Sequence, residues 1–108
     1  MPDRPPLLTP PPAHFTPYAA ARTLPNIVVD GPPLPSTVLT LSHWPNNQSP
    51  PRLKRDTSTA TAFAYLDAAD LHQVVPWVTN NHFDEDGLFS MYAVTEPESA
   101  LADRALRG

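Results

Sequence analysis

The placement of proline constrains the fold of this chain more than any other feature. The chain has 108 residues and 16 prolines, and 14 of these prolines lie within the first 51 residues. Proline fixes its own φ angle and has no backbone N–H, so it interrupts helices and is kept out of the interior of sheets. The sequence therefore argues against a helical bundle or coiled coil and predicts a single small domain with a thin core.

Net charge and cysteine content exclude several classes of function. The formal net charge is −4 and the basic residues form no long run, which argues against a dedicated nucleic-acid surface. The chain contains no cysteine, so it has no disulfide, thiolate zinc site, iron–sulfur cluster or cysteine nucleophile. The N-terminal region has no apolar stretch long enough for a signal peptide or a membrane span. We expect a cytoplasmic protein with no membrane partner.

Residues 1–25 are expected to form a proline-rich arm that is extended or disordered. Six prolines among the first twelve residues favour polyproline-like backbone. Pro2 and Pro5 also have the spacing of a PxxP ligand, with Arg4 beside them. Capture of a partner by this arm is therefore an alternative to a passive tail.

Residues 26–108 are expected to form an α/β domain. Two short β-branched segments between chain breakers predict strands over residues 26–30 and 36–41. The link between them, Gly31 to Pro35, is too short for a parallel crossover, so we expect the two strands to be antiparallel if they are neighbours. An alanine-rich helix over residues 57–69 then leads to a third strand over residues 73–79, which the crossover should make parallel to the second.

Two further helices are predicted in the last part of the chain. One covers residues 88–94, and the other begins near Pro97, which suits the first turn of a helix, and runs to the terminus. The expected architecture is a partial three-layer α/β domain with a short mixed sheet of about three strands and two to three helices.

The most informative stretch is His82-x-Asp84-x-Asp86-Gly87, directly after the third expected strand. Open α/β sheets place their sites at the carboxyl ends of strands. Alternate residues of an extended segment point the same way, so His82, Asp84 and Asp86 can converge on one metal ion. Mixed imidazole and carboxylate ligands suit Mn²⁺, Fe²⁺ or Zn²⁺ better than Ca²⁺. The alternative is that the carboxylates only cap the helix that follows.

The stretch from His82 to Ser90 resembles motif I of the DHH phosphoesterase superfamily. RecJ-like members have a strand, then D-x-D-x-D-G, then a helix with a serine three residues after the glycine. The spacing, Gly87, Ser90 and the strand-to-helix context match, whereas His82 replaces the first acidic residue. The manganese pyrophosphatase branch also has a histidine in motif I, one residue further from its aspartates. Residues 24–108 also look like an uncharacterised bacterial family with a DHH-type first motif.

This resemblance implies a divalent-metal-dependent phosphoesterase or phosphohydrolase. Its metal ligands would be His82, Asp84 and Asp86, its cofactor Mn²⁺, and its substrate a phosphorylated small molecule or nucleotide. The superfamily also has a second aspartate motif, an Asp-His-His motif and a substrate-binding domain, none of which follows Ser90. We therefore expect an N-terminal fragment that is inactive without its missing C-terminal part. The alternative is a non-enzymatic binding or interaction module of unknown function.

Supporting residues are expected on the same edge of the sheet. A histidine after the second strand, a basic loop and the helix N-terminus that follows can together hold an anionic group. The candidates for support or phosphate binding are His43, Arg52, Lys54, Arg55 and Ser90. A solvated basic loop is the alternative for the three cations. The antiparallel pairing puts Asp30 at the opposite edge, so we expect it to lie far from the site.

Overall fold

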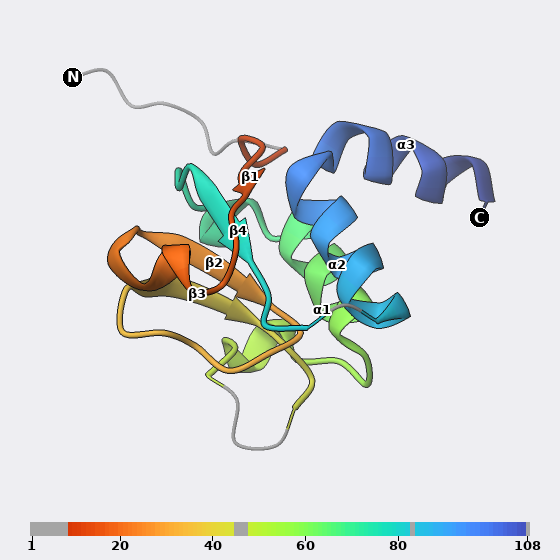
Figure 1. The fold of residues 1–108 in the computed structure, drawn as a ribbon. Helices are drawn as coiled ribbons and strands as arrows, with labels where there is room; N and C mark the ends of the chain where they lie inside the picture. Colours follow the sequence, from red (N-terminus) through yellow and green to blue (C-terminus); the bar gives the residue numbers. More distant parts are fainter. Residues whose placement is uncertain (1–8, 45–47, 83, 108) are drawn as a thin grey trace.

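A parallel four-stranded sheet forms the centre of the fold (Figure 1). The structure is a computed structural model that describes residues 9–44, 48–82 and 84–107, with side chains described as far as residue 104. The strands stand in the order β1-β4-β2-β3, and every neighbouring pair is parallel. Their bounds are β1 His14–Phe15, β2 Asn26–Val29, β3 Thr37–Leu41 and β4 Trp77–Thr79.

Three α-helices lie to one side of this sheet (Figure 1). They are α1 (Ser58–Asp67), α2 (Glu85–Thr95) and α3 (Pro97–Arg107). Helices α1 and α2 pack against each other and against the strands, and α3 packs on α2. The core between sheet and helices is built from the alternate, inward residues of the strands and the apolar faces of the helices, including Ile27, Val29, Leu41, Val78, Ala62, Tyr65, Leu66, Met91 and Val94. None of the described helices is both long and apolar enough to cross a membrane.

Part of the proline-rich segment packs into the domain. Ala21 is completely buried in a short 3₁₀ helix (Ala20–Thr23). The Ala21 carbonyl oxygen accepts hydrogen bonds from Asn26 Nδ2 (3.1 Å) and Ser36 Oγ (2.7 Å). Strand β1 lies in the same segment, and the His14 N–H donates to the Pro76 carbonyl (2.8 Å). Residues 13–23 therefore belong to the domain, in contrast to the expected arm. Residues 1–8, which include the PxxP spacing, lie outside the described residues.

The α/β class predicted from the sequence is confirmed, but the expected antiparallel pairing is wrong. Strands β2 and β3 are parallel neighbours, with Ile27 opposite Leu39 and Val29 opposite Leu41. A β2 strand of four residues is only about 13 Å long. The extended, proline-rich link over residues 30–36 can reach about 23 Å, so it returns the chain without a helix. The sheet is consequently parallel throughout, not mixed, and the described α-helices form one layer, not two.

The remaining elements follow the predicted order with shifted bounds. Helix α1 begins where expected, because the Thr57 hydroxyl caps it by accepting from the Ala60 N–H (3.0 Å). The third predicted strand is shorter, since only residues 77–79 pair, and its nearest neighbours are β1 and β2. Helix α2 starts three residues earlier than predicted, and α3 begins at Pro97 as predicted. Two more 3₁₀ helices, Pro51–Leu53 and Ala69–Leu71, flank α1.

Candidate metal centre

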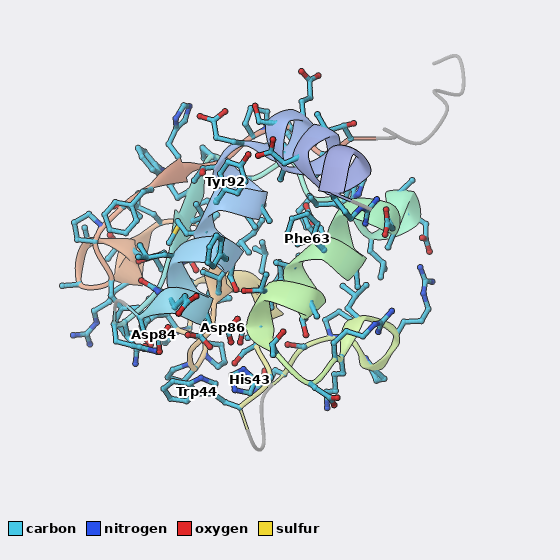
Figure 2. The ribbon with its side chains drawn as sticks, turned by 90° about the vertical axis from the view of Figure 1, so that its right-hand side faces the viewer. His43, Trp44, Phe63, Asp84, Asp86 and Tyr92 are labelled. Atoms are coloured by element: carbon cyan, nitrogen blue, oxygen red, sulfur yellow. The ribbon has the colours of Figure 1, made fainter. Side chains whose placement is uncertain are left out.

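Parallel pairing brings the carboxyl ends of three strands to one edge of the sheet. Asp30 follows β2, His43 comes soon after β3, and His82 comes soon after β4. Asp84 and Asp86 lie at the N-terminus of α2, which starts from the same edge. Figure 2 shows His43, Trp44, Asp84 and Asp86 gathered at one end of the helices. This edge is the usual position of a site in an open α/β sheet.

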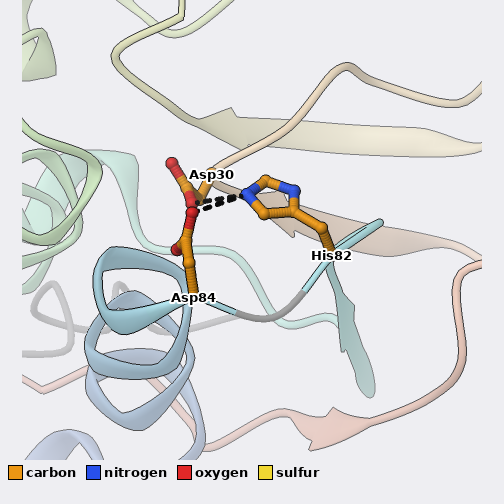
Figure 3. Close-up of side chains that lie close together, drawn as sticks. All are labelled: Asp30, His82 and Asp84. Carbon is orange, nitrogen blue, oxygen red and sulfur yellow. Dashed lines mark hydrogen bonds and ion pairs between the residues drawn. The ribbon is translucent and has the colours of Figure 1, made fainter.

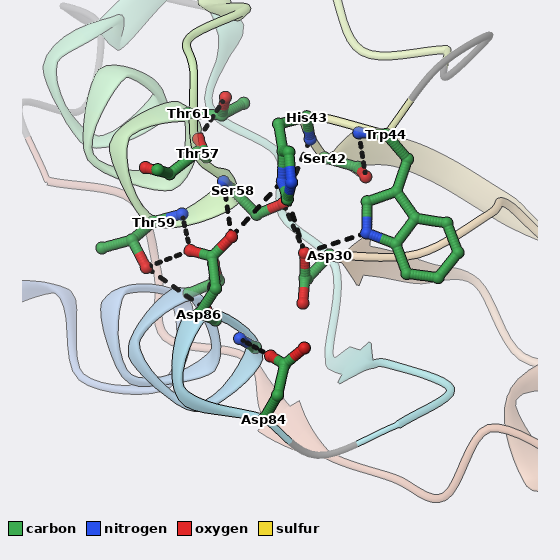
Figure 4. Close-up of polar contacts among 12 residues, drawn as sticks. Asp30, Ser42, His43, Trp44, Thr57, Ser58, Thr59, Thr61, Asp84 and Asp86 are labelled. Atoms are coloured by element: carbon green, nitrogen blue, oxygen red, sulfur yellow. Dashed lines mark hydrogen bonds and ion pairs between the residues drawn. The ribbon is translucent and has the colours of Figure 1, made fainter.

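Asp30 lies at the centre of the cluster and has an unusual conformation. Its φ angle is 51°, in the left-handed region, and its side chain is only 1% exposed. Oδ1 accepts hydrogen bonds from Ser58 Oγ (2.7 Å) and Trp44 Nε1 (3.1 Å), as Figure 4 shows. Oδ2 is buried and has no hydrogen-bond partner among the described residues. Strained backbone of this kind clusters at functional sites, so Asp30 is a strong site candidate.

Burial raises the pKa of Asp30 above its ordinary value. The hydrogen bonds from Ser58 and Trp44 act in the opposite direction, and the nearby charges of Asp84 and Asp86 raise the pKa further. These hydrogen bonds stabilise the anionic form of Asp30, and a neighbouring positive charge would stabilise it further. The group around Oδ2 is therefore suited to hold either a proton or a cation.

Asp30, His82 and Asp84 form the first group of ligand atoms (Figure 3). Nε2 of His82 lies 3.2 Å from Asp30 Oδ2 and 3.0 Å from Asp84 Oδ2. Nδ1 of His82 faces Asn81 Oδ1 at 2.7 Å. When Nδ1 donates its proton to that oxygen, a neutral ring directs a lone pair from Nε2 at two carboxylates. That arrangement is repulsive unless a proton or a cation lies between the three groups.

Asp84 has one oxygen engaged and one directed into this group. It is the N-cap of α2, and its Oδ1 accepts from the Gly87 N–H (2.7 Å). This hydrogen bond holds the pKa of Asp84 below its ordinary value, against a smaller opposing effect of burial. Oδ2 is left to face His82 and Asp30. Asp84 thus combines the capping expected of an acidic loop with a geometry suited to metal binding.

Asp30, His43 and Asp86 form the second group (Figure 4). Nδ1 of His43 lies 3.3 Å from Asp86 Oδ2 and 3.5 Å from Asp30 Oδ1. The same nitrogen lies 2.7 Å from the Ser58 hydroxyl, which donates its own proton to Asp30. The first and second groups therefore share Asp30 and touch it through different oxygens.

Asp86 is held more fully by the protein than Asp84 is. It accepts from the N–H groups of Ser58 (2.9 Å) and Thr59 (2.7 Å) and from the Thr59 hydroxyl (2.6 Å), so a residue of α2 caps the N-terminus of α1. Burial alone would raise the pKa of Asp86, but the hydrogen bonds from Thr59 and Ser58 hold it below its ordinary value. With both oxygens engaged, Asp86 has less capacity for a metal than Asp84.

The three ligands predicted from the sequence surround Asp30 but do not form one triplet. His82 and Asp84 are in contact, whereas Asp86 groups with His43. Asp30 itself was expected at the remote edge, and that expectation is wrong because β2 and β3 are parallel. The signal that could have found it is a carboxylate directly after the β-branched strand over residues 26–29 and before Gly31.

The supporting residues have different positions. His43 lies in the site, whereas Arg52 forms a two-pronged ion pair with Asp70 (2.7 and 2.8 Å) on the exposed surface. Arg55 donates to the carbonyl oxygens of Arg52 and Lys54, and Lys54 is exposed. Arg52 is thus engaged with Asp70, and Arg55 with the backbone of the loop. Ser90 is buried and donates to the Asp86 carbonyl (2.7 Å), so its hydroxyl supports the first turn of α2.

The fold and the cluster together define a small parallel α/β domain with carboxylate and imidazole groups at the carboxyl edge of its sheet. The chain belongs to DUF6687, a family of unknown function, whose family model matches residues 11–107. The match therefore covers the sheet, all three α-helices and every residue of the cluster. No curated protein gives a significant match, and neither does any solved structure.

Proposed function

We propose that this chain is the metal-binding domain of a divalent-metal-dependent phosphoester hydrolase of the DHH type, with Mn²⁺ as its cofactor. The observation that carries the proposal is Asp30 Oδ2, which is buried, has no hydrogen bond from the described residues and lies 3.2 Å from His82 Nε2, in one group with Asp84. A buried anionic oxygen is costly unless a hydrogen bond or a positive charge stabilises it, and a metal ion held between these three residues would supply that charge. The donor set of one imidazole and two carboxylates fits Mn²⁺.

Asp30 Oδ2, His82 Nε2 and Asp84 Oδ2 would hold the ion. When bound, a divalent ion of this kind stabilises charge on a phosphoryl group and lowers the pKa of a bound water. The surrounding residues orient the three donors: Ser58 and Trp44 fix the other oxygen of Asp30. Gly87 fixes the other oxygen of Asp84, and Asn81 fixes the ring of His82. Such outer contacts are typical of built metal sites.

The substrate that we propose is a phosphorylated small molecule or nucleotide. His43 is the supporting residue best placed to contact it, because its side chain is 38% exposed and borders Asp30 and Asp86. The N-termini of α1 and α2 also meet at this edge, and their dipoles favour negative charge there. We do not propose a phosphate contact for Arg52, because the Arg52 guanidinium is paired with Asp70.

Calorimetric titration of Mn²⁺ tests the proposal with charge-removing variants that keep the fold. Asparagine tolerates the left-handed region and is a good N-cap, so Asp30→Asn and Asp84→Asn should both fold. We expect each variant to bind Mn²⁺ at least about tenfold more weakly than the wild type. Asp70→Asn, at a surface ion pair, is the matched control and should bind as the wild type does. Equal affinities for all four proteins would contradict the ligand assignment.

A non-enzymatic interaction module is the second candidate, and one observation favours it. Leu88 and Phe89 on α2 are 55% and 52% exposed. With Tyr92 they line a shallow hollow that also borders Asp84 and Glu85. Exposed apolar side chains grouped in this way often mark a contact surface. Wild-type protein that gave no heat with Mn²⁺ would favour this second candidate over the first.

A further inference from the structure

Asn80, which directly follows β4, is a buried polar side chain without a hydrogen-bond partner in the described part of the chain. It is 3% exposed, and neither Oδ1 nor Nδ2 forms a hydrogen bond with any of the described residues. A buried carboxamide normally has its donors and acceptor satisfied, because an unmade hydrogen bond leaves the full cost of removing the group from water. An orphaned amide at the carboxyl edge of the sheet therefore needs an explanation.

The position of Gly87 shows where this amide lies. A Cβ atom on Gly87 would come within 2.6 Å of Asn80 Nδ2, 3.2 Å of Asp84 Oδ1 and 3.3 Å of Asp30 Oδ2. The amide end of Asn80 and one oxygen of each carboxylate thus border the same small space. Gly87 is a poor helix former within the first turn of α2, and its missing side chain keeps this space open.

We infer that Asn80 is a further residue of the metal site and supplies its carboxamide oxygen to the cation from the buried side. The inference rests on the proposed function. A half-turn of the amide plane exchanges its nitrogen and oxygen, which places Oδ1 at the space that Asp84 Oδ1 and Asp30 Oδ2 also border. Amide oxygens are suitable ligands for hard divalent ions. This one adds a donor without adding a fourth negative charge to Asp30, Asp84 and Asp86.

Thr79 provides a matched control one residue away. Its Oγ1 is also buried and also lacks a partner among the described residues. Consecutive residues of a strand point to opposite faces, and Val78 and Asn80 share the face that α2 covers. Thr79 therefore points away from the site. If the two unpaired groups have a purely structural cause, substitutions at Asn80 and Thr79 should affect Mn²⁺ affinity equally. If Asn80 is a metal ligand, only the substitution at Asn80 should weaken Mn²⁺ binding.

The test measures unfolding in urea with EDTA and Mn²⁺ affinity by calorimetry, on the full chain. Asn80→Leu should keep or raise the urea midpoint, because it removes unpaired polar atoms, and should weaken Mn²⁺ binding about tenfold or more. Thr79→Val should also keep or raise the midpoint but should bind Mn²⁺ as the wild type does. Asn80→Asp retains an oxygen ligand, so it should lower the midpoint in EDTA and bind Mn²⁺ at least as tightly as the wild type.

The outcomes separate this inference from the proposed function. Wild-type affinity in Asn80→Leu, with binding lost in Asp30→Asn, would overturn the inference and leave the proposed function standing. Absence of Mn²⁺ binding by the wild type, or unchanged binding in Asp30→Asn, would overturn both. If Asn80→Leu fails to fold, Asn80→Asp tests the role of Asn80 as a ligand. Weaker Mn²⁺ binding by Asn80→Asp than by the wild type would then overturn the inference.

Discussion

Asp30 combines an unusual backbone conformation with a central position in the candidate site. Its backbone adopts a left-handed conformation, and its carboxylate is buried with one oxygen held by Ser58 and Trp44. Aspartate tolerates this conformation better than most residues, but asparagine and glycine would tolerate it too. The left-handed backbone at position 30 therefore does not explain why the residue is a carboxylate. The proposed cation site does explain it, because the cation needs a negatively charged ligand.

Gly87 is the residue at which helix propensity and site geometry oppose each other. Alanine is a better helix former than glycine by about 1 kcal/mol, so propensity alone predicts that Gly87→Ala stabilises the chain. The new Cβ would lie 2.6 Å from Asn80 Nδ2, which forces Asn80 or α2 to move. Overpacking of this kind costs about 1–3 kcal/mol, so after the gain in helix propensity we expect a net loss of up to about 2 kcal/mol in the free energy of unfolding, measured in urea with EDTA. A gain of about 1 kcal/mol would show that the space is not needed.

At the scale of elements, Asp86 joins the first turns of two helices. It belongs to α2, yet it accepts from the N–H groups at the start of α1. Replacement of such a cap by alanine usually costs about 1 kcal/mol. Asp86→Ala should therefore unfold at lower urea concentration at pH 7 than the wild type. Asp56→Ala, at an exposed position before α1, is the control and should change little.

The effect of Asp86→Ala should also depend on pH. The pKa of Asp86 in the folded chain is below its ordinary value of 3.8, so its contribution is present above that value. The contribution is lost as the pH falls through the folded pKa. The difference between variant and wild type, measured with EDTA, should therefore shrink in strong acid. Asp30, whose pKa shifts in the opposite direction, is present in both proteins, and the loss of the Asp86 charge removes one of the smaller causes of that shift. A difference that stayed constant down to about pH 2 would contradict this account.

The elements of the domain were largely predictable, but their pairing was not. Helical periodicity, Thr57 at the N-cap and Pro97 in the first turn give the positions of α1 and α3 correctly. The direction of β3 depends on the path of residues 30–36, and a short loop usually indicates a hairpin. Because the strands are so short, an extended proline-rich link can return the chain instead. This one error in pairing moved Asp30 out of the predicted site.

At the scale of the whole molecule, the prolines have two structural uses. Some separate strands, as expected, and others lie in the segment that carries β1 and the 3₁₀ helix Ala20–Thr23. That segment has no periodicity, because it joins the domain through backbone hydrogen bonds and small buried residues such as Ala13 and Ala21. Periodicity cannot predict packing of this kind. The motif at His82 to Asp86 was predictable, since alternation after a strand is a local property, whereas Asp30 and Asn80 depend on strand order.

The central claim is that Asp30, His82 and Asp84 hold a divalent ion at the carboxyl edge of the sheet. Crystals of the wild-type chain grown with Mn²⁺ and measured at a wavelength with strong manganese anomalous scattering test it most directly. We expect an anomalous peak in ligand contact with Asp30 Oδ2, His82 Nε2 and Asp84 Oδ2. Well-ordered crystals at saturating Mn²⁺ with no anomalous peak between these three atoms would contradict it.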